Sequence, residues 1–346
     1  MIKSWKDSVN DAVKDIIKYQ NKEKTPFKSG IEHFDQNTLG GIYPGDCIVV
    51  AGLPSHGKSF FNAEIEGGIL EFAESSGQKV SLLRFNLEMS VKKLLMRELR
   101  KETGLKMSQI LLEKPKDLSS FKAVCDRQRR DNVYHCELAP NSKEFETLCR
   151  KFIADNIESD LILISLDHIA LAKGAEAKKT IDEIMSVVIA LKMEFKEKVS
   201  FIILSQLNRD IEARTGMEEF PKLSDVYMSS TMAFAADVLI VVMNPHIMGK
   251  IRYGSLQVKN NPQLSNFFIE GKVTSSGYGS LVTKGVVYYH YIKLRMPDSE
   301  EFLSTFGKYI YIDNPKEKHT PLSDKEEVDW AMGKNLMRSN QEDIDI

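Results

Sequence analysis

The feature that most restricts the fold of this sequence is a short glycine-rich segment between an apolar run and a helical stretch. Residues 52–59 read Gly-Leu-Pro-Ser-His-Gly-Lys-Ser, which fits the GxxxxGK[ST] pattern, and they follow the apolar run CIVVAG. This strand–loop–helix context distinguishes a phosphate-binding loop from an ordinary glycine turn. In such a loop, backbone N–H groups and the dipole of the following helix bind phosphate oxygens. The residues expected to bind the nucleotide are Gly52, Ser55, His56, Gly57, Lys58, Ser59 and Phe60.

Short β-rich runs alternate with longer helical stretches from Gly30 to about Pro245. Several runs are almost continuous Ile, Leu and Val, as expected of parallel strands buried on both faces. The alternation predicts an α/β fold with a mostly parallel central sheet flanked by helices. The predicted strands are 47–52, 80–86, 161–166, 200–205 and 238–243. The predicted helices are 58–75, 90–103, 119–130, 143–156 and 180–198.

The two ends of the chain and one internal segment differ from this pattern. Residues 2–20 place apolar side chains at helical spacing, which predicts an amphipathic helix, and a polar linker follows it. The apolar stripe of this helix has to be buried, either on its own domain or on a neighbouring subunit. Residues 246–286 are rich in Gly, Ser and Asn and predict a β-ribbon or loop insertion before a strand at 286–294. The expected division is a helix at 1–25, an α/β domain with the phosphate loop at 26–323 and an acidic, flexible tail at 324–346.

Composition excludes several classes of protein. The chain of 346 residues has a net charge of −2, from 47 basic and 49 acidic residues, so a nucleic-acid surface would have to be local. The four cysteines form no CxxC pair, which argues against a zinc site or a disulfide framework. No apolar run approaches the ~20 residues of a membrane helix, and the charged N-terminus does not resemble a signal peptide. A cytoplasmic protein is therefore expected.

Three apolar runs end in polar side chains that suit nucleotide chemistry. LILISLD ends at Asp167, and a carboxylate at the carboxyl end of a parallel strand can hold Mg²⁺, as Ser59 can. A second run leads to Glu88, which could accept a proton from the attacking water if its strand neighbours that of the phosphate loop. The alternative for Glu88 is an acid that simply favours a helix start. A third run ends at Ser205 and Gln206, and the amide suits a sensor that couples hydrolysis to motion.

Lys293 and Arg295 lie two residues apart on a predicted strand, so their side chains are expected to face the same side. Two cations on one face can bind a triphosphate. An arginine there can stabilise transition-state charge from across a subunit interface. The alternative is a solvated strand end.

Together these segments resemble the ATPase domain of the DnaB-type replicative helicases, a family with a RecA-like fold. The resemblance runs from about Pro26 to Pro297, with a gap at 246–286. It rests on the stretches TPFKSGIEHFDQNTLGGIYPGDCIVVAGLPSHGKS, FNLEMS, LILISLDHI, LSQLNRDIEAR, KLSDV and IKLR. LDHI is more similar to the phage and mitochondrial ring helicases than to the bacterial ones.

The resemblance implies an ATP- and Mg²⁺-dependent ring, usually a hexamer, that moves along single-stranded DNA and unwinds a replication fork. It also implies that residues 2–20 are the linker helix that docks on the next subunit. The residues that match the family's functional positions are the phosphate-loop lysine Lys58, the Mg²⁺ ligands Ser59 and Asp167, the catalytic glutamate Glu88, the coupling glutamine Gln206, and the trans-acting finger Lys293 and Arg295.

Three departures from the family pattern modify this expectation. Only about 25 residues precede the core, so contact with a separate primase or helicase loader must be arranged differently. The insertion at 246–286 has no counterpart in the family, and together with the short chain it suggests a phage or mobile-element version. The family's DNA loop is replaced by Tyr-Met-Ser-Ser at 227–230. Candidate DNA contacts are then Lys173, Lys178, Lys179, Arg209, Ser229, Ser230 and Thr231, although the lysines could equally be a solvated helix start.

Two other functions fit part of the sequence. A RecA- or RadA-type recombination ATPase would share the phosphate loop and a glutamate at position 88, but not SQLNR followed by K-x-R. A non-catalytic, ATP-gated replication scaffold would have no need for a residue that activates water. The ring helicase accounts for all of these motifs together.

Overall fold

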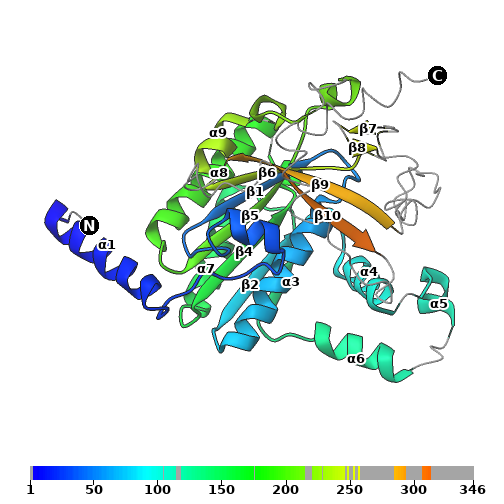
Figure 1. Ribbon diagram of the computed structural model, residues 1–346, viewed down its shortest axis with the longest axis horizontal. Coiled ribbons are helices and arrows are strands. Elements are labelled where there is room, and N and C mark those ends of the chain that lie inside the picture. Colours follow the sequence, from blue (N-terminus) through cyan, green and yellow to red (C-terminus); the bar gives the residue numbers. More distant parts are fainter. Residues whose placement is uncertain are drawn as a thin grey trace, which may run out of the picture.

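The computed structural model describes residues 3–103, 105–113, 118–174, 176–214, 220–227, 229–245, 248, 252–253, 256–257, 284–293 and 306–312. At its centre is an eight-stranded sheet in the order β10-β9-β6-β1-β5-β4-β2-β3 (Figure 1). The strands from β6 to β3 are parallel, whereas β9 and β10 are antiparallel to their neighbours. The strands are β1 (Cys47–Gly52), β2 (Val80–Asn86), β3 (Val133–Cys136), β4 (Leu161–Asp167), β5 (Val199–Gln206), β6 (Val238–Met243), β9 (Lys284–Lys293) and β10 (Phe306–Ile312). The predicted α/β fold with a mostly parallel sheet is confirmed.

Helices cover both faces of this sheet, and none of those described is long and apolar enough to cross a bilayer. They are α1 (Trp5–Gln20), α2 (Glu32–Asn37), α3 (Lys58–Ser76), α4 (Val91–Thr103), α5 (Met107–Leu112), α6 (Leu118–Gln128), α7 (Ser142–Asp155), α8 (Ala177–Glu194) and α9 (Ser229–Ala235). Of the predicted insertion at 246–286, the structure describes little more than the short pair β7 (Arg252–Tyr253) and β8 (Leu256–Gln257). The predicted tail at 324–346 lies outside the described residues.

The sheet has two apolar faces because successive side chains of a strand point to opposite sides. On one face, α2 and α3 pack against alternate residues of the strands, such as Phe61 and Ile65 against Val50 and Leu163. On the other face, α7 and α8 cover the remaining positions. Each central strand is buried on both faces, which explains why the apolar runs in the sequence are almost continuous.

The α3 face becomes polar at the carboxyl ends of the strands. There β1, β2, β4 and β5 end at Gly52, Asn86, Asp167 and Gln206, and each of these residues continues the face on which the α3 core lies. Pairing aligns Gly52 with Gln206 and Asn86 with Asp167. Four chain segments far apart in the sequence therefore meet at the N-terminus of α3.

Helix α1 is held to the rest of the chain only near its C-terminal end, among the described contacts. It is capped by Ser4, whose hydroxyl accepts the N–H of Asp7, and it projects away from the sheet in Figure 1. The Trp5 side chain is 83% exposed, and no residue of the helix is buried. Lys24 fixes its far end through ion pairs with Asp15 and Glu197. The alternative that α1 buries its stripe on its own domain is therefore wrong for the described part of the chain.

The segment after α1 crosses helix α3 at very short range. A Cβ placed on Gly68 of α3 would lie 1.8 Å from the carbonyl oxygen of Ser29, so only glycine fits there. The next residue, Gly30, has a φ of +76°, and a Cβ placed on it would lie 3.6 Å from Cα of Gly68. The linker thus lies directly on the helix that begins with the phosphate loop.

Candidate nucleotide-binding site

The glycine-rich loop joins the end of β1 to the start of α3, as the motif predicted. A Cβ on Gly52 would meet the carbonyl oxygen of Val242 at 2.6 Å and the Lys58 side chain at 3.0 Å, which excludes any larger residue. Gly57 has a φ of +94° and Ser55 one of +65°, so the loop turns through left-handed conformations before the helix starts. This backbone presents the N-terminus of a 19-residue helix at the sheet edge.

Lys58 is buried in this loop and binds it from inside. Its ammonium group donates hydrogen bonds of 2.9 Å to the carbonyl oxygens of Gly52 and Leu53. Burial lowers the pKa of Lys58 to about 8, against the opposing effect of the Glu88 and Asp167 carboxylates. An anion beside the ammonium group would raise this pKa and favour the charged form of Lys58. The loop therefore suits a phosphate group.

His56 and Phe60, on either side of Gly57-Lys58-Ser59, contact other parts of the chain. Nδ1 of His56 accepts the N–H of Asn244 at 3.0 Å, and burial lowers the pKa of His56 to about 4. A neutral His56 therefore ties the loop to the chain that leaves β6. Phe60 is buried, with the Arg97 guanidinium 6.0 Å from the centre of its ring.

Asp167 ends β4 directly beside the start of α3. Burial raises the pKa of Asp167 to about 6, while its hydrogen bond with Ser59 acts in the opposite direction. Among the described residues, Oδ1 of Asp167 is buried and has no hydrogen-bond partner. A buried carboxylate oxygen without a partner, next to a hydroxyl, is a donor set that suits Mg²⁺. The residues present therefore fit the metal that the sequence predicted here.

The strand before Glu88 does not neighbour the phosphate-loop strand, so that premise of the sequence interpretation is wrong. β2 pairs with β4 instead, and β5 and β4 separate it from β1. The glutamate nevertheless reaches the same site, because the N–H of Leu87 donates to the carbonyl of Asp167 at 2.8 Å. Glu88 is exposed and interacts electrostatically with both Lys58 and Asp167.

Gln206 lies on the other side of Asp167, next to Gly52 of the phosphate loop. Its Nε2 atom is 3.2 Å from Nε2 of His168, a histidine that the sequence interpretation did not assign to the site. His168 is buried, and burial lowers its pKa. The sequence signal that could have assigned His168 to the site is its position immediately after Asp167. The hydroxyl of Ser205 is buried and points away from Gln206 along the alternating strand.

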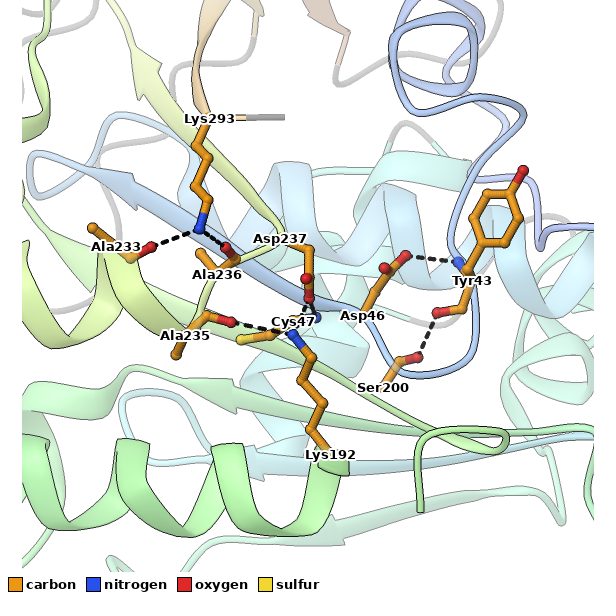
Figure 2. Close-up of polar contacts among 10 residues, drawn as sticks. All are labelled: Tyr43, Asp46, Cys47, Lys192, Ser200, Ala233, Ala235, Ala236, Asp237 and Lys293. Carbon is orange, nitrogen blue, oxygen red and sulfur yellow. Dashed lines mark hydrogen bonds and ion pairs between the residues drawn. The ribbon is translucent and has the colours of Figure 1, made fainter. Parts of the chain in front are cut away.

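Lys293 binds its own chain rather than projecting freely. At the end of β9, its ammonium group donates to the carbonyl oxygens of Ala233, at 2.8 Å, and Ala236 (Figure 2). These carbonyls belong to the C-terminal end of α9, where cations are favoured by the helix dipole. Figure 2 also shows that the ammonium group of Lys192 donates to the carbonyl oxygen of Ala235, at the same helix end, and to the carboxylate of Asp237. Arg295, the other predicted finger residue, lies outside the described residues.

The candidate DNA contacts fall on two adjacent helix starts and one separate turn. Ser229, Ser230 and Thr231 form the first turn of α9, and Thr231 donates a hydrogen bond of 2.5 Å to Asp182 of α8. Lys178 and Lys179 are exposed in the first turn of that same helix, and Lys173 is exposed just before it. Arg209 is exposed in a short 3-10 helix, Arg209–Ala213. Asp182 thus joins the lysine segment to the serine segment.

The arrangement defines a class of protein: a RecA-like P-loop fold, with the phosphate loop, a carboxylate and an amide at one sheet edge. The family model described as "DnaB-like helicase C terminal domain" matches residues 27–268, well over half of the chain. The chain belongs to this family.

Individual relatives and a solved structure agree with this assignment. The chain is 28% identical over 246 residues to the replicative DNA helicase DnaB of Leifsonia xyli, covering 68% of this chain and 51% of the relative. It is 30% identical over 234 residues to that of Buchnera aphidicola (subsp. Baizongia pistaciae), covering 63% of this chain and 48% of the relative. The solved "ATPase Domain of G40P" has a TM-score of 0.63 at 16% identity and covers 87% of this chain and 94% of its own, which supports the fold. The chain spans about half the length of the curated relatives it matches.

Proposed function

We propose that this protein is an ATP-driven DNA helicase of the DnaB type, working as a ring that moves along single-stranded DNA. The observation that carries the proposal is the meeting of Lys58, Asp167, Glu88 and Gln206 at one end of the sheet. Each comes from a different strand or loop, and each has the chemistry that its role in nucleotide hydrolysis requires. Membership of the family agrees with this, and the relatives named above are replicative helicases.

ATP with Mg²⁺ would supply the phosphoanhydride bond whose cleavage drives movement. Backbone N–H groups of the loop would hold phosphate oxygens, and the ammonium of Lys58 would turn from the loop carbonyls towards them. Ser59 and Asp167 would hold the metal through their oxygen atoms. The exposed carboxylate of Glu88 would take a proton from the attacking water. Gln206, positioned by His168, would report the state of the γ-phosphate to the neighbouring loops.

The assembled ring is supported by the exposed stripe of α1. The apolar side chains of Trp5, Val9, Val13, Ile16 and Ile17 are exposed on this helix. An apolar stripe left in water by its own domain favours a contact with another subunit. Under this proposal, Lys293 and Arg295 complete the site of a neighbour, and the first turns of α8 and α9 contact the DNA backbone.

The first experiment measures ATP hydrolysis with and without single-stranded DNA, together with the mass of the particle by light scattering in the same buffer. We expect turnover that DNA stimulates, from a particle the size of a ring. Tight nucleotide binding with no turnover under any condition, including with DNA and at high protein concentration, would favour the scaffold. Strand exchange without fork unwinding would favour a recombination ATPase.

The residue that activates water is tested by Glu88→Gln. This change keeps the size of an exposed side chain, so the variant should fold and bind ATP normally while turnover falls about 100-fold or more. Glu71→Gln, at an exposed position of α3, is the matched control and should hydrolyse ATP at the wild-type rate. Near-normal turnover by the Glu88 variant would place the base elsewhere.

A further inference from the structure

A buried polar network lies below the site, between helix α3 and strands β2 and β4. Nε of Arg84 in β2 is 2.7 Å from Oε2 of Glu66 in α3. The other oxygen of Glu66 accepts a hydrogen bond of 2.8 Å from Nδ2 of Asn62, one helical turn earlier. The same Nδ2 group lies 3.1 Å from Oγ of Ser165 in β4. Glu66, Asn62 and Ser165 are buried, and Arg84 is largely so.

The register of the sheet places this network one level below the site residues. Arg84 pairs with Ser165, and the next pair on the same face, Asn86 with Asp167, ends the two strands at the site. The pair below, Leu82 with Leu163, belongs to the apolar core under α3. The network is thus the layer between the core and the site.

On α3 and on both strands, the residues of the network lie two or three positions from residues of the site. Asn62 lies three residues after Ser59, so the two are neighbours on the helix surface. Ser165 precedes Asp167 by two residues and therefore faces the same side of β4. Arg84 stands in the same relation to Asn86, two residues before Glu88. One set of contacts connects the three segments that carry Ser59, Asp167 and Glu88.

Stability alone is a poor explanation for these charges. Buried ion pairs lose much of their attraction to the cost of desolvation, and apolar residues of similar volume often replace them without loss. The apolar contacts of α3 with the sheet are less directional than hydrogen bonds, so they constrain the position of the helix more than its rotation about its own axis. Hydrogen bonds depend steeply on angle and distance and can fix that rotation.

We propose that Glu66, Arg84, Asn62 and Ser165 are positioning residues that set the rotation of α3 relative to β2 and β4. They thereby fix the placement of Ser59 against Asp167 and Glu88. This inference rests on the proposed function, because the placement matters for Mg²⁺ and for the attacking water. The contacts of the network are made between side chains of this chain alone, and Oδ1 of Asn62 is buried without a hydrogen-bond partner among the described residues.

The test separates positioning from stability by removing the charges singly and together. Glu66→Met leaves Arg84 without its partner and should unfold more easily than the wild type. The double variant Glu66→Met/Arg84→Met replaces the pair with apolar side chains and should regain most of the thermal stability. The control is Glu146→Met/Arg150→Met, which makes the same changes in a half-exposed ion pair of α7, whose arginine also contacts Glu194 of α8. Ser165→Ala removes only the contact of Asn62 with β4.

Two readouts are measured on the folded variants: steady-state ATP turnover, and the Mg²⁺ concentration that half-saturates binding of a fluorescent ATP analogue. For the double variant we expect a kcat about tenfold lower at a nearly unchanged KM for ATP, and a Mg²⁺ requirement about tenfold higher. Ser165→Ala should shift both in the same direction by less, and the surface control should shift neither.

The outcomes distinguish this inference from the proposed function. A double variant as stable as the wild type, with the same kcat and the same Mg²⁺ requirement, would show that the network serves packing alone. A wild-type chain that binds nucleotide but does not hydrolyse it would count against the helicase. The Mg²⁺ titration would still decide the positioning role in that case. A wild-type chain that binds no nucleotide would overturn both.

Discussion

At the scale of single residues, the candidate site is organised at a cost to the stability of the chain. Lys58 is buried and Asp167 is partly buried, with its Oδ1 atom enclosed, and desolvation raises the pKa of Asp167 and lowers that of Lys58. The positive charge of Lys58 compensates the negative charge of Asp167 only in part, because the ammonium group is hydrogen-bonded to loop carbonyls and not to the carboxylate. A metal ion beside Asp167 and a phosphate group beside Lys58 would each supply the opposite charge that these desolvated groups lack.

The cost of the Asp167 charge predicts that Asp167→Asn stabilises the nucleotide-free protein at neutral pH. The folded pKa of about 6 lies above the ordinary aspartate value of 3.8, so ionisation destabilises the fold fully above pH 6 and has no effect below pH 4. The variant should gain roughly 1–3 kcal/mol at pH 7–8. Its advantage should shrink towards zero as the pH falls from about 6 to about 4. Thermal unfolding across this range measures it.

The matched control for this prediction is Asp155→Asn, at an exposed position of α7. It should leave the pH dependence of unfolding unchanged. The Asp167 variant should also lose Mg²⁺-dependent ATP turnover, since an amide is a poorer ligand for the metal. No gain in stability at pH 7–8 would mean that the carboxylate is better solvated than its burial indicates.

At the scale of secondary-structure elements, α9 connects two predicted functions within seven residues. Its first turn holds Ser230 and Thr231, candidate DNA contacts, and its last turn is bound by Lys293 of the predicted finger. Lys293 therefore has a role inside its own subunit that the K-x-R spacing does not reveal. A change at this lysine should be felt at the DNA as well as at the neighbouring nucleotide.

Lys293→Met should accordingly weaken both the fold and the binding of single-stranded DNA. Loss of the cation from the C-terminal end of α9 should cost about 0.5–1 kcal/mol in urea unfolding. Affinity for a fluorescent oligonucleotide should fall severalfold by anisotropy, because the first turn of α9 loses its support. Lys196→Met, an exposed lysine after α8, is the control. Unchanged DNA affinity with lost turnover would restrict Lys293 to the finger.

The elements that could be predicted from the sequence are those with strong local patterns. The strands at 47–52, 80–86 and 238–243 have the predicted bounds. The first and the last are nearly unbroken apolar runs, and the second is apolar at four of its seven positions. β3 was missed because it is only four residues long and its alternation, intermediate and exposed, lacks a buried face. Helices α2 and α9 were missed because they are too short to show a helical period.

The candidate site shows the same division between local and long-range information. Lys58 and Ser59 could be placed because their motif is continuous in the sequence. The neighbour of β2 could not, because the order of parallel strands depends on how the connecting helices cross the sheet. The contact of His168 with Gln206 joins residues 38 apart along the chain. No periodicity in one sequence contains that pairing.

At the scale of the whole molecule, the exposed stripe on α1 predicts how the assembly can be broken. Ile16→Asp places a charge in this stripe, in which no residue is buried by the described part of the same chain. The variant should therefore keep the thermal stability of a single chain while the mass by light scattering falls from a ring to smaller species. DNA-stimulated turnover should fall with it, because the sites lie between subunits in the proposed ring.

The control for this change is Lys14→Asp, a polar position of the same helix, which should leave the mass unchanged. A fall in thermal stability without a change in mass would show that α1 packs on its own subunit in solution. A ring that survives Ile16→Asp at low protein concentration would place the main subunit contact elsewhere.

The close crossing of Ser29 over Gly68 has a mechanical consequence. Here two backbone segments are in direct contact, with no side chain between them that could change its conformation. A displacement of the linker would therefore be transmitted to α3 almost undiminished. Since α1 continues into this segment, a neighbour that pulled on α1 would apply its load near the middle of α3. The helix would act as a lever, with the load at Gly68 and its working end at the loop that holds Lys58.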